Sequence, residues 1–414
     1  MSCQSPASCI IAGGGPAGVM CGLLLARAGV RVTVLEKHRD FLRDFRGDTI
    51  HPSTLEVLAE IGLLDEFRRR PHQEITEISA EVNNHRFVVG DFSKLRTRCP
   101  FLALMPQWHF LDMLADVARR LPTFRLLMET AATGLIQEGD RIAGITAHGP
   151  DGPLSLRADL VIGADGRHST LRTQAGFEVV ELGAPIDVLW LRISRKPDDP
   201  HAPLGRFDAG GVFVMLYRDD YWQCAYLIPK GGYDAIRADG IDALRTRIAR
   251  IAGFAQDRVH EIASWDDVHL LSVAVNRTPE WARPGLLLIG DAAHAMSPIG
   301  GVGINLAIQD AVATANILGP ILQTRAPTID ELRRVEARRL LPVRLTQWLQ
   351  VQIQNRILAA TLEQTGPISP PLLLRLFNAI PALRVLPARA VGLGFRPEHV
   401  ELAAVPPAGA GAIG

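Results

Sequence analysis

The first part of the chain alternates between short apolar runs and polar or glycine-rich breaks. Residues 9–12 (CIIA) form an apolar run that stops at a glycine-rich turn. Apolar residues then recur at helical spacing over 17–28, and the β-branched run 31–35 ends in Glu36. This order of strand, glycine turn, helix and strand predicts a βαβ unit, in which the strands are parallel and the crossover is right-handed.

Later segments extend this α/β pattern. A helix is expected to begin near Pro52, because Ser53 and Glu56 have the spacing of a capping box. Two further apolar runs, 159–162 and 286–289, each stop at a short polar loop. We expect both runs to be strands of the same sheet.

The pattern changes between about residues 184 and 272. Runs of β-branched and aromatic residues are separated there by Asp-Asp and Gly-Gly pairs, which predicts a mostly antiparallel sheet. A helix is expected over 304–318, and from about residue 329 the pattern is helical and interrupted by prolines. The sequence thus predicts a β-rich insertion laid on an α/β domain.

Composition removes several classes of protein. The 44 basic and 44 acidic residues cancel, so no excess charge favours nucleic acid or anionic lipid. The five cysteines are scattered without a C-x-x-C pair, which argues against a disulfide framework or a metal site and favours a reducing compartment. The first residues do not resemble a signal peptide, and no apolar run is long enough to span a membrane. We expect a cytoplasmic protein.

The most specific local pattern is Gly13-x-Gly15-x-x-Gly18 between the first strand and helix. Such glycines allow a tight turn, a close approach of a pyrophosphate to the backbone, and close packing of helix on strand. Glu36 follows Gly18 by 18 positions, at the end of the second strand, where a carboxylate can accept hydrogen bonds from ribose hydroxyls. The pattern predicts a dinucleotide site.

Two more polar loops follow predicted strands. The first is 163–169, GADGRHS, which taken alone is as consistent with a simple turn as with a binding loop. The second begins at Gly290-Asp291 and continues through Pro298 to a glycine-rich helix start at 300–305. Free backbone N–H groups at such a helix start could face a carbonyl or an anionic ring edge.

Together, these three motifs resemble those of the group A flavoprotein monooxygenases with the p-hydroxybenzoate hydroxylase fold. The segments 43–49 (RDFRGDT) and 106–108 (PQW) are also similar to that family, and the resemblance covers most of residues 8–320. It implies a fold of the α/β (α+β) class, with a Rossmann-type domain of mostly parallel sheet, an inserted antiparallel sheet and C-terminal helices. It also implies FAD as cofactor, with a nicotinamide donor that visits without a domain of its own.

The resemblance assigns roles residue by residue. Glu36 would bind the adenosine ribose, Asp291 the ribityl chain, and Pro298 would border the isoalloxazine. Candidates for a catalytic role are Pro298, Arg46 and His51, although a histidine such as His51 is more often a structural, hydrogen-bonding residue. The residues expected to bind FAD are Gly13, Gly15, Pro16, Ala17, Gly18, Glu36, Lys37, Arg46, Gln107, Asp165, Gly290, Asp291, Pro298, Gly301, Gly303, Ile304 and Asn305.

The implied reaction is hydroxylation that depends on NADH or NADPH and on O2. In the family, a flavin C4a-hydroperoxide passes one oxygen atom to an electron-rich carbon, and the cofactor supplies this chemistry. The protein must exclude water and hold the substrate beside the flavin. No metal and no nucleic acid are needed.

The expected substrate is hydrophobic and aromatic, phenol-like or polycyclic. Alternating residues of two predicted strands share faces that could roof the flavin, although core packing is an open alternative for them. Arg192 is the exception, since it could bind an acid if it points inward. The residues proposed to contact substrate are Arg192, Phe213, Met215, Trp222, Cys224 and Tyr226.

Other functions stay open on the same fold. Halogenation is disfavoured, because the family's W-x-W-x-I-P motif is replaced by CAYLIP at 224–229. Reduction of prenyl or other unsaturated chains needs a similar apolar pocket. A third alternative is a flavin-binding protein that sequesters a ligand without turnover.

The domain limits follow from these motifs. We assign 1–72, 98–178 and 273–330 to the FAD-binding domain, and 73–97 and 179–272 to the substrate-binding sheet. Residues 331–402 would form a C-terminal helical region and 403–414 a flexible tail. The stripe of Leu341, Leu345, Trp348, Leu349 and Ile353 should pack on the flavin domain or on a second subunit, so monomer and homodimer both stay open. A helix on a membrane surface is a further alternative for this stripe.

Overall fold

The structure, a computed structural model, describes residues 7–42, 49–83, 85–200, 204–218 and 220–401. A six-stranded sheet forms its first layer, and β20 at its edge is antiparallel to β21 while the other neighbours pair in parallel. The strand order is β20 (Ala282–Arg283), β21 (Leu286–Leu288), β12 (Leu160–Gly163), β1 (Ser8–Ala12), β2 (Arg31–Leu35) and β8 (Phe124–Leu127). The predicted βαβ unit is therefore β1, α1 (Pro16–Arg27) and β2.

Helices α1, α4 (Gln107–Ala118) and α8 (Gly303–Leu322) pack together beside this sheet. Helix α1 is apolar around most of its circumference, because neighbouring helices and the sheet cover it on several sides. Helix α8 is longer at both ends than the predicted 304–318. These contacts form the largest hydrophobic core of the molecule.

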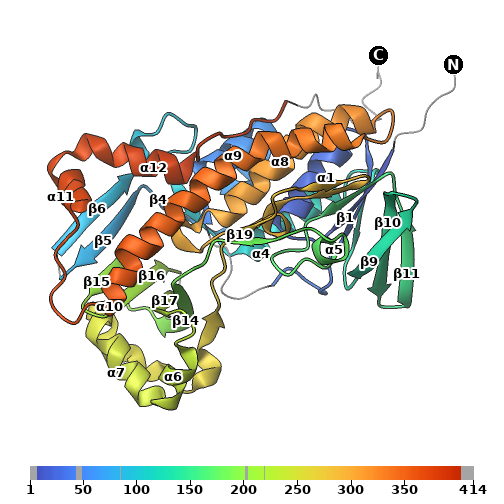
Figure 1. Cartoon of the computed structure of the whole chain (residues 1–414). Helices are drawn as coiled ribbons and strands as arrows, with labels where there is room; N and C mark the ends of the chain where they lie inside the picture. The colour runs from blue at the N-terminus through green and yellow to red at the C-terminus, as the bar shows by residue number, and fades with distance from the viewer. Residues whose placement is uncertain (1–6, 43–48, 84, 201–203, 219, 402–414) are drawn as a thin grey trace, which may run out of the picture.

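The second large layer is a seven-stranded sheet. Its order is β18 (His269–Leu271), β14 (Ile186–Ser194), β17 (Tyr221–Pro229), β16 (Gly211–Tyr217), β15 (Leu204–Asp208), β5 (Glu77–Val82) and β6 (His85–Asp91). Its pairs are antiparallel except β15 with β5, which is parallel. Figure 1 shows α6 (Tyr233–Ala238) and α7 (Ile241–Ala252) beneath the β14–β17 part of this sheet, far from β9–β11. The two layers confirm the predicted fold class.

Smaller elements complete the fold. Three short sheets consist of β9 (Ala131–Glu138), β10 (Arg141–Gly149) and β11 (Gly152–Arg157); β13 (Val180–Glu181), β19 (Asn276–Arg277) and β22 (His294–Ala295); and β3 (Thr49–Ile50), β7 (Leu102–Leu104) and β4 (Gln73–Ile75). The remaining α-helices are α2 (Pro52–Glu60), α3 (Leu64–Arg68), α5 (Thr170–Gln174), α9 (Ile329–Ile353), α10 (Ala360–Glu363), α11 (Leu372–Ala379) and α12 (Val385–Gly392).

The capping box predicted for α2 is wrong. His51 is the N-cap residue, and its side chain makes no cap hydrogen bond. Pro52 takes the first helical position, where its missing N–H costs nothing, so Ser53 already lies inside the helix. Glu56 instead accepts a hydrogen bond from the backbone N–H of Arg98.

Much of the α9 stripe does not pack on the rest of this chain, so the first alternative predicted for it is wrong, and packing on a second subunit stays a prediction. Leu341, Leu345 and Trp348 face outward, and Trp348 is 62% exposed. The inward face carries buried glutamines. Gln347 donates to the backbone carbonyls of Asn276 and Ala295, and Gln350 donates to that of Ser297 in the loop that precedes α8. Hydrophobicity alone suggested the opposite orientation, because it ignores the hydrogen bonds that the loop's backbone needs.

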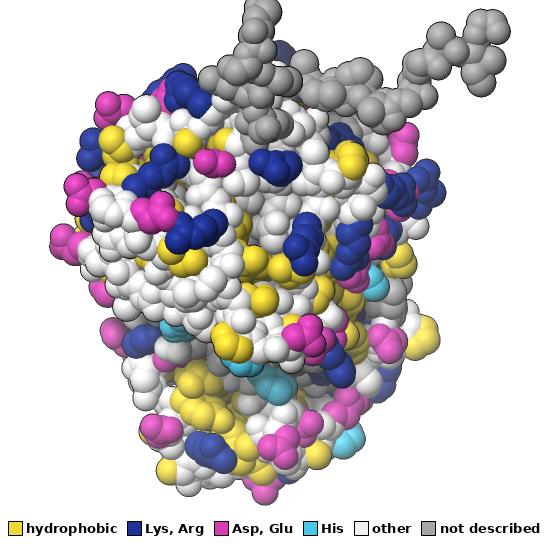
Figure 2. All heavy atoms as spheres, turned by 90° about the vertical axis from the view of Figure 1, so that its right-hand side faces the viewer, with side chains coloured by type: hydrophobic (Ala, Val, Ile, Leu, Met, Phe, Trp, Pro, Cys, Tyr) yellow, Lys and Arg dark blue, Asp and Glu magenta, His cyan; other side chains and the backbone are white. Residues whose placement is uncertain are grey.

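The surface agrees with the balanced composition. Figure 2 shows acidic and basic side chains interspersed over one face of the molecule, with no large area of a single sign. Within the described ranges, no helix combines the length and apolar character needed to cross a membrane.

Candidate active site

The glycine-rich turn has the geometry of a phosphate cradle. Gly13 has φ +108°, and a Cβ there would lie 2.2 Å from the carbonyl oxygen of Ala164. A Cβ at Gly18 would lie 1.9 Å from the carbonyl oxygen of Gly13. At Gly15 a Cβ would meet nothing within 4 Å, so the space beside it is open. Helix α1 begins there at Pro16, and the free backbone N–H groups in the first turn of the helix favour an anion. This open space fits the pyrophosphate of FAD.

Glu36 lies beside the same turn. Its carboxylate accepts hydrogen bonds from the backbone N–H of Gly14 (3.1 Å) and of His38 (3.0 Å). These bonds hold the acid at the carboxyl end of β2, as the sequence predicted. Lys37 is exposed.

The other two motif loops meet the glycine turn because β12 lies between β1 and β21. A Cβ added at Gly290 would lie 3.0 Å from the Cβ of Ala17 in α1. Arg167 of the first loop pairs with Asp291 of the second at 3.7 Å, and the Asp291 side chain is 34% exposed. The three loops therefore converge at the carboxyl edge of the parallel strands, where ligands bind in open α/β sheets.

Asp165 has a more structural role than Asp291. Its two oxygens accept hydrogen bonds from the Ser169 hydroxyl (2.5 Å) and the Leu171 N–H (3.2 Å), which order the start of α5. Arg172, buried, donates to the carbonyl oxygens of Ala292 (3.0 Å) and Arg167 (2.6 Å) and so joins the two motif loops. No motif in the sequence marks Arg172, so it was not among the predicted site residues.

The loop before α8 is held by Asn305. Its amide oxygen accepts from the His51 N–H (2.9 Å) and the Thr54 hydroxyl (2.7 Å), and its amide nitrogen donates to Thr49 and Gly301 carbonyls, both at 3.3 Å. Asn305 is thus fully engaged within the protein. It can position a flavin ring only through the loop that it holds.

Other predicted residues surround this loop. Gly301 has φ +61°, and a Cβ there would lie 2.8 Å from the Thr49 hydroxyl. Gly303 starts α8 and faces open space, and Ile304 is buried. Pro298 precedes the turn that contains Gly301 and is half-buried.

His51 does not fit the predicted catalytic role. Its side chain is fully buried, and burial lowers its pKa to about 4, although hydrogen bonds to the backbone of Val391 and Gly300 oppose this effect. The neutral ring donates from Nδ1 to the Val391 carbonyl oxygen at 2.7 Å. His51 therefore links the loop region to α12.

Two more predictions concern the cofactor. Arg46 lies outside the described residues. Gln107 is the first residue of α4 and is half-buried.

Except for Arg192, the proposed substrate residues are on the opposite face of the sheet from the one expected. The alternating side chains that should roof the flavin pack instead against α7 in a closed hydrophobic core, so their predicted role in substrate contact is wrong. These residues are Phe213, Met215, Trp222, Cys224 and Tyr226. A regular alternation predicts two faces but does not say which one a later helix will cover.

The other face of the same strands meets the Pro298 loop and the end of α9. Val188, Trp190 and Val214 lie there in a cluster that includes Ile299 of the Pro298 loop and Ile353 of α9. Arg192 shares this face by register and is exposed, with its guanidinium 4.8 Å from the centre of the Tyr221 ring. The wall nearest the motif loop is thus largely apolar.

A buried charge network contacts the Asp291 loop at Gly290 and holds it in place. Asp310 of α8 accepts hydrogen bonds from the Gly290 N–H (3.0 Å), His294 (2.6 Å) and Arg339 (2.9 Å). Burial would raise the pKa of Asp310, but His294 and Arg339 lower it below its usual value. Arg339 also binds Glu398 at 3.1 Å. A single acid within the apolar stretch 304–318 was the available sequence signal for Asp310.

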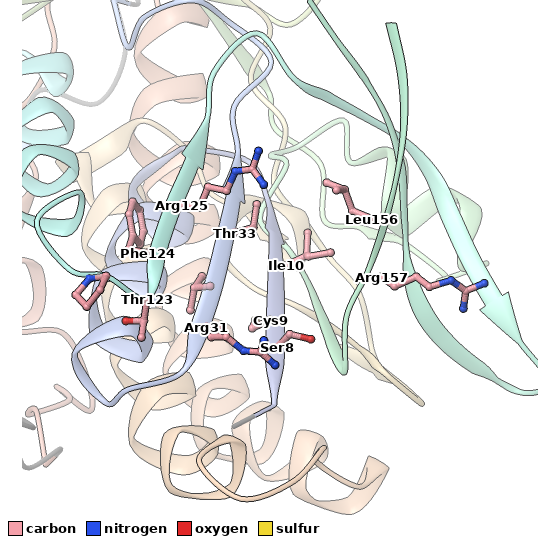
Figure 3. A pocket seen from close by; sticks show the side chains of 12 residues that line it. Ser8, Cys9, Ile10, Arg31, Thr33, Thr123, Phe124, Arg125, Leu156 and Arg157 are labelled. Carbon is pink, nitrogen blue, oxygen red and sulfur yellow. The ribbon is translucent and has the colours of Figure 1, made fainter. Parts of the chain in front are cut away.

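A pocket of about 300 Å³ lies elsewhere (Figure 3). Ser8, Arg31 and Thr123, which line it, are at or next to the first residues of their strands. It therefore lies at the amino ends of the parallel strands, opposite the edge where the motif loops meet. We do not assign it to the cofactor.

Comparison with known proteins identifies the family. Residues 7–344 match the family described as FAD binding domain. The chain is 37% identical over 371 residues to 6-methylpretetramide 4-monooxygenase of Streptomyces rimosus, covering 87% of this chain and 86% of that protein.

Solved structures show the same fold. PqsL of Pseudomonas aeruginosa, a probable FAD-dependent monooxygenase, superposes with a TM-score of 0.73 and 24% identity over 86% of this chain and 96% of that one. The OxyS anhydrotetracycline hydroxylase of Streptomyces rimosus superposes with a TM-score of 0.71 and 24% identity, over 93% of this chain and 75% of that one. The predicted resemblance is confirmed: the chain belongs to the FAD binding domain family and is an FAD-dependent aromatic monooxygenase.

Proposed function

We propose that this enzyme hydroxylates a hydrophobic, polycyclic aromatic small molecule, with NADH or NADPH as the electron donor and O2 as the oxygen source. The observation that carries the proposal is the apolar sheet face that contacts the Pro298 loop through Ile299. A flat apolar molecule suits this wall better than a small carboxylate does. The relative named for a pretetramide substrate supports this class.

Different residues would bind different parts of the cofactor. The open space at Gly15 and the start of α1 would receive the pyrophosphate, and Glu36 the ribose. Asp291, partly exposed and paired with Arg167, would accept hydrogen bonds from the ribityl hydroxyls. Bound FAD, once reduced, supplies the activation of O2.

The protein's own part in the reaction is positioning and exclusion of water. Asn305 fixes the loop against Thr49 and His51, so that its backbone is rigid where a flavin ring would lie. The apolar wall of Trp190 and Val214 would hold the substrate and keep water away. Arg192 stays exposed on this face, where it could meet a polar group of the substrate.

The test is a screen of polycyclic and monocyclic phenols with the purified, FAD-loaded enzyme. We expect the right compound to accelerate oxidation of NADH or NADPH, to consume one O2 per turnover, and to gain one oxygen atom in mass. Asp291→Ala serves as control, because its loss of FAD should abolish the reaction without unfolding the protein. A product that gains two hydrogens and no oxygen would instead show a reductase.

A further inference from the structure

Gln354 marks an irregularity in the C-terminal helix. Helix α9 ends at Ile353, and Gln354–Ala359 forms a π-helical turn before α10. A π-helical turn accommodates an extra residue in a helix, because its backbone hydrogen bonds span five residues instead of four. Such turns are frequent at functional sites. The turn lies where this helix passes the Pro298 loop.

The side chain of Gln354 is buried with only part of its hydrogen-bonding capacity used. Its exposed fraction is 0%, and Nε2 donates to the Ser297 hydroxyl at 2.5 Å. Oε1 has no partner among the residues that the structure describes. Exchanging the two ends of the amide would change which end is unpaired, but one end would stay so.

The neighbouring glutamines differ from Gln354. Gln350 accepts from the Ser297 N–H (3.1 Å) and donates to the carbonyls of Ser297 (3.0 Å) and Ile299 (2.9 Å). Gln347 likewise binds Asn276, Ala295 and Arg277. Since these two side chains already hold the loop, the unpaired end of Gln354 has no evident structural purpose, and leaving it unpaired is unfavourable.

The surroundings of Gln354 connect it to the proposed substrate wall. Ile353 and Ile357 on either side of it belong to the apolar cluster with Trp190. Its partner Ser297 immediately precedes Pro298. The amide therefore lies between the apolar sheet face and the loop expected to border the flavin ring.

We propose that the unpaired end of the Gln354 amide binds a hydroxyl group of the substrate, and that Gln354 is a specificity-determining residue. This inference rests on the proposed function. A hydroxyl both donates and accepts, so it satisfies either end of the amide. Gln354 would thus select, within a largely apolar pocket, polycyclic substrates that carry a phenolic hydroxyl at a matching position.

The test compares Gln354→Met with Gln350→Leu in the FAD-loaded protein. Binding is measured without turnover, from the change of the flavin spectrum on adding a hydroxylated polycyclic ligand and its analogue without the hydroxyl. Gln354→Met should weaken binding of the hydroxylated ligand roughly tenfold, because a neutral buried hydrogen bond is lost. It should leave binding of the analogue unchanged.

Thermal unfolding without ligand separates this role from a structural one. Gln354→Met should lower the melting temperature less than Gln350→Leu does, because it removes one hydrogen bond to a hydroxyl together with an unpaired oxygen, whereas Gln350→Leu leaves three backbone groups without partners. A melting temperature lowered as far as in Gln350→Leu, together with unchanged ligand affinity in Gln354→Met, would overturn the proposal. If the wild type binds such ligands but oxygenates none of them, the proposed function fails while the binding data still decide the role of Gln354. Wild-type protein that binds no hydroxylated polycycle would overturn both.

Discussion

At the scale of single residues, the glycines of the first turn have different physical tasks. Gly18 is required by packing, because a Cβ there would overlap the Gly13 carbonyl. Gly15 has φ −74° and ψ −175°, which any residue can adopt, and open space beside it. Its requirement comes from the ligand and not from the fold.

This difference predicts opposite effects of two substitutions. Gly15→Val should leave the stability of the FAD-free protein within about 0.5 kcal/mol of wild type but abolish FAD binding, because the side chain fills the space for the pyrophosphate. Gly18→Val should destabilise the FAD-free protein itself. Thermal unfolding and flavin absorbance of the purified variants would measure both effects. A yellow Gly15→Val protein would contradict the placement of the pyrophosphate.

His51 predicts a dependence of stability on pH. Its pKa is about 4 in the folded protein and about 6.5 in the unfolded chain. As the pH falls from 6.5 to 4, the unfolded chain takes up a proton that the folded protein refuses, so the folded state loses roughly 3 kcal/mol. Above pH 6.5 this contribution is constant.

The measurement is denaturant unfolding of wild type and His51→Gln at pH 7 and pH 5. The wild type should lose more stability between these values than the variant, since other titrating groups affect both equally. Equal losses would show that the ring of His51 is already protonated or exposed.

At the scale of elements, α9 acts as a clamp through its glutamines. The Pro298 loop has no regular secondary structure around Ser297, so its backbone groups need partners from elsewhere. Gln350 supplies three of them. The polar side of this helix is therefore its inner side.

We predict that Gln350→Leu lowers the free energy of unfolding by roughly 2–3 kcal/mol, because buried backbone groups of Ser297 and Ile299 lose their partners. Gln352→Leu, at a half-buried position of the same helix, is the matched control and should change stability little. Denaturant unfolding of the two variants tests this. Similar losses of unfolding free energy in both variants would contradict this stabilising role of Gln350.

At the scale of the whole molecule, the C-terminal segment closes the structure on the flavin domain. Arg339 of α9 is 1% exposed and joins Asp310 of α8 to Glu398 near the end of the described chain. Arg338 binds Glu398 as well, at 2.8 Å. Three segments distant in sequence are thus held by one charge network behind Gly290.

Arg339→Met should cost about 3–5 kcal/mol, because it leaves a buried carboxylate with fewer partners. The control is Arg333→Met on the same helix, whose ion pair with Asp330 at 3.6 Å is exposed and should contribute less than about 1 kcal/mol. Calorimetric or denaturant unfolding would distinguish them. Equal, small effects would show that the network does not hold the C-terminal segment in place.

The sequence by itself determined the βαβ unit and the three motif loops. Local rules suffice there: a glycine turn between strands, and an acid at the end of β2, depend on neighbours along the chain. The convergence of the loops also followed, because the carboxyl ends of parallel strands share one edge.

Only the tertiary structure decided which face of each element points inward. The alternation in β16 and β17 defines two faces equally well, and α7 covers the one that carries Phe213 and Trp222. In α9 the need to pair the backbone of the Pro298 loop turned glutamines inward and left Trp348 outside. Both choices depend on partners far away in sequence, and hydrophobicity at a single position does not record them.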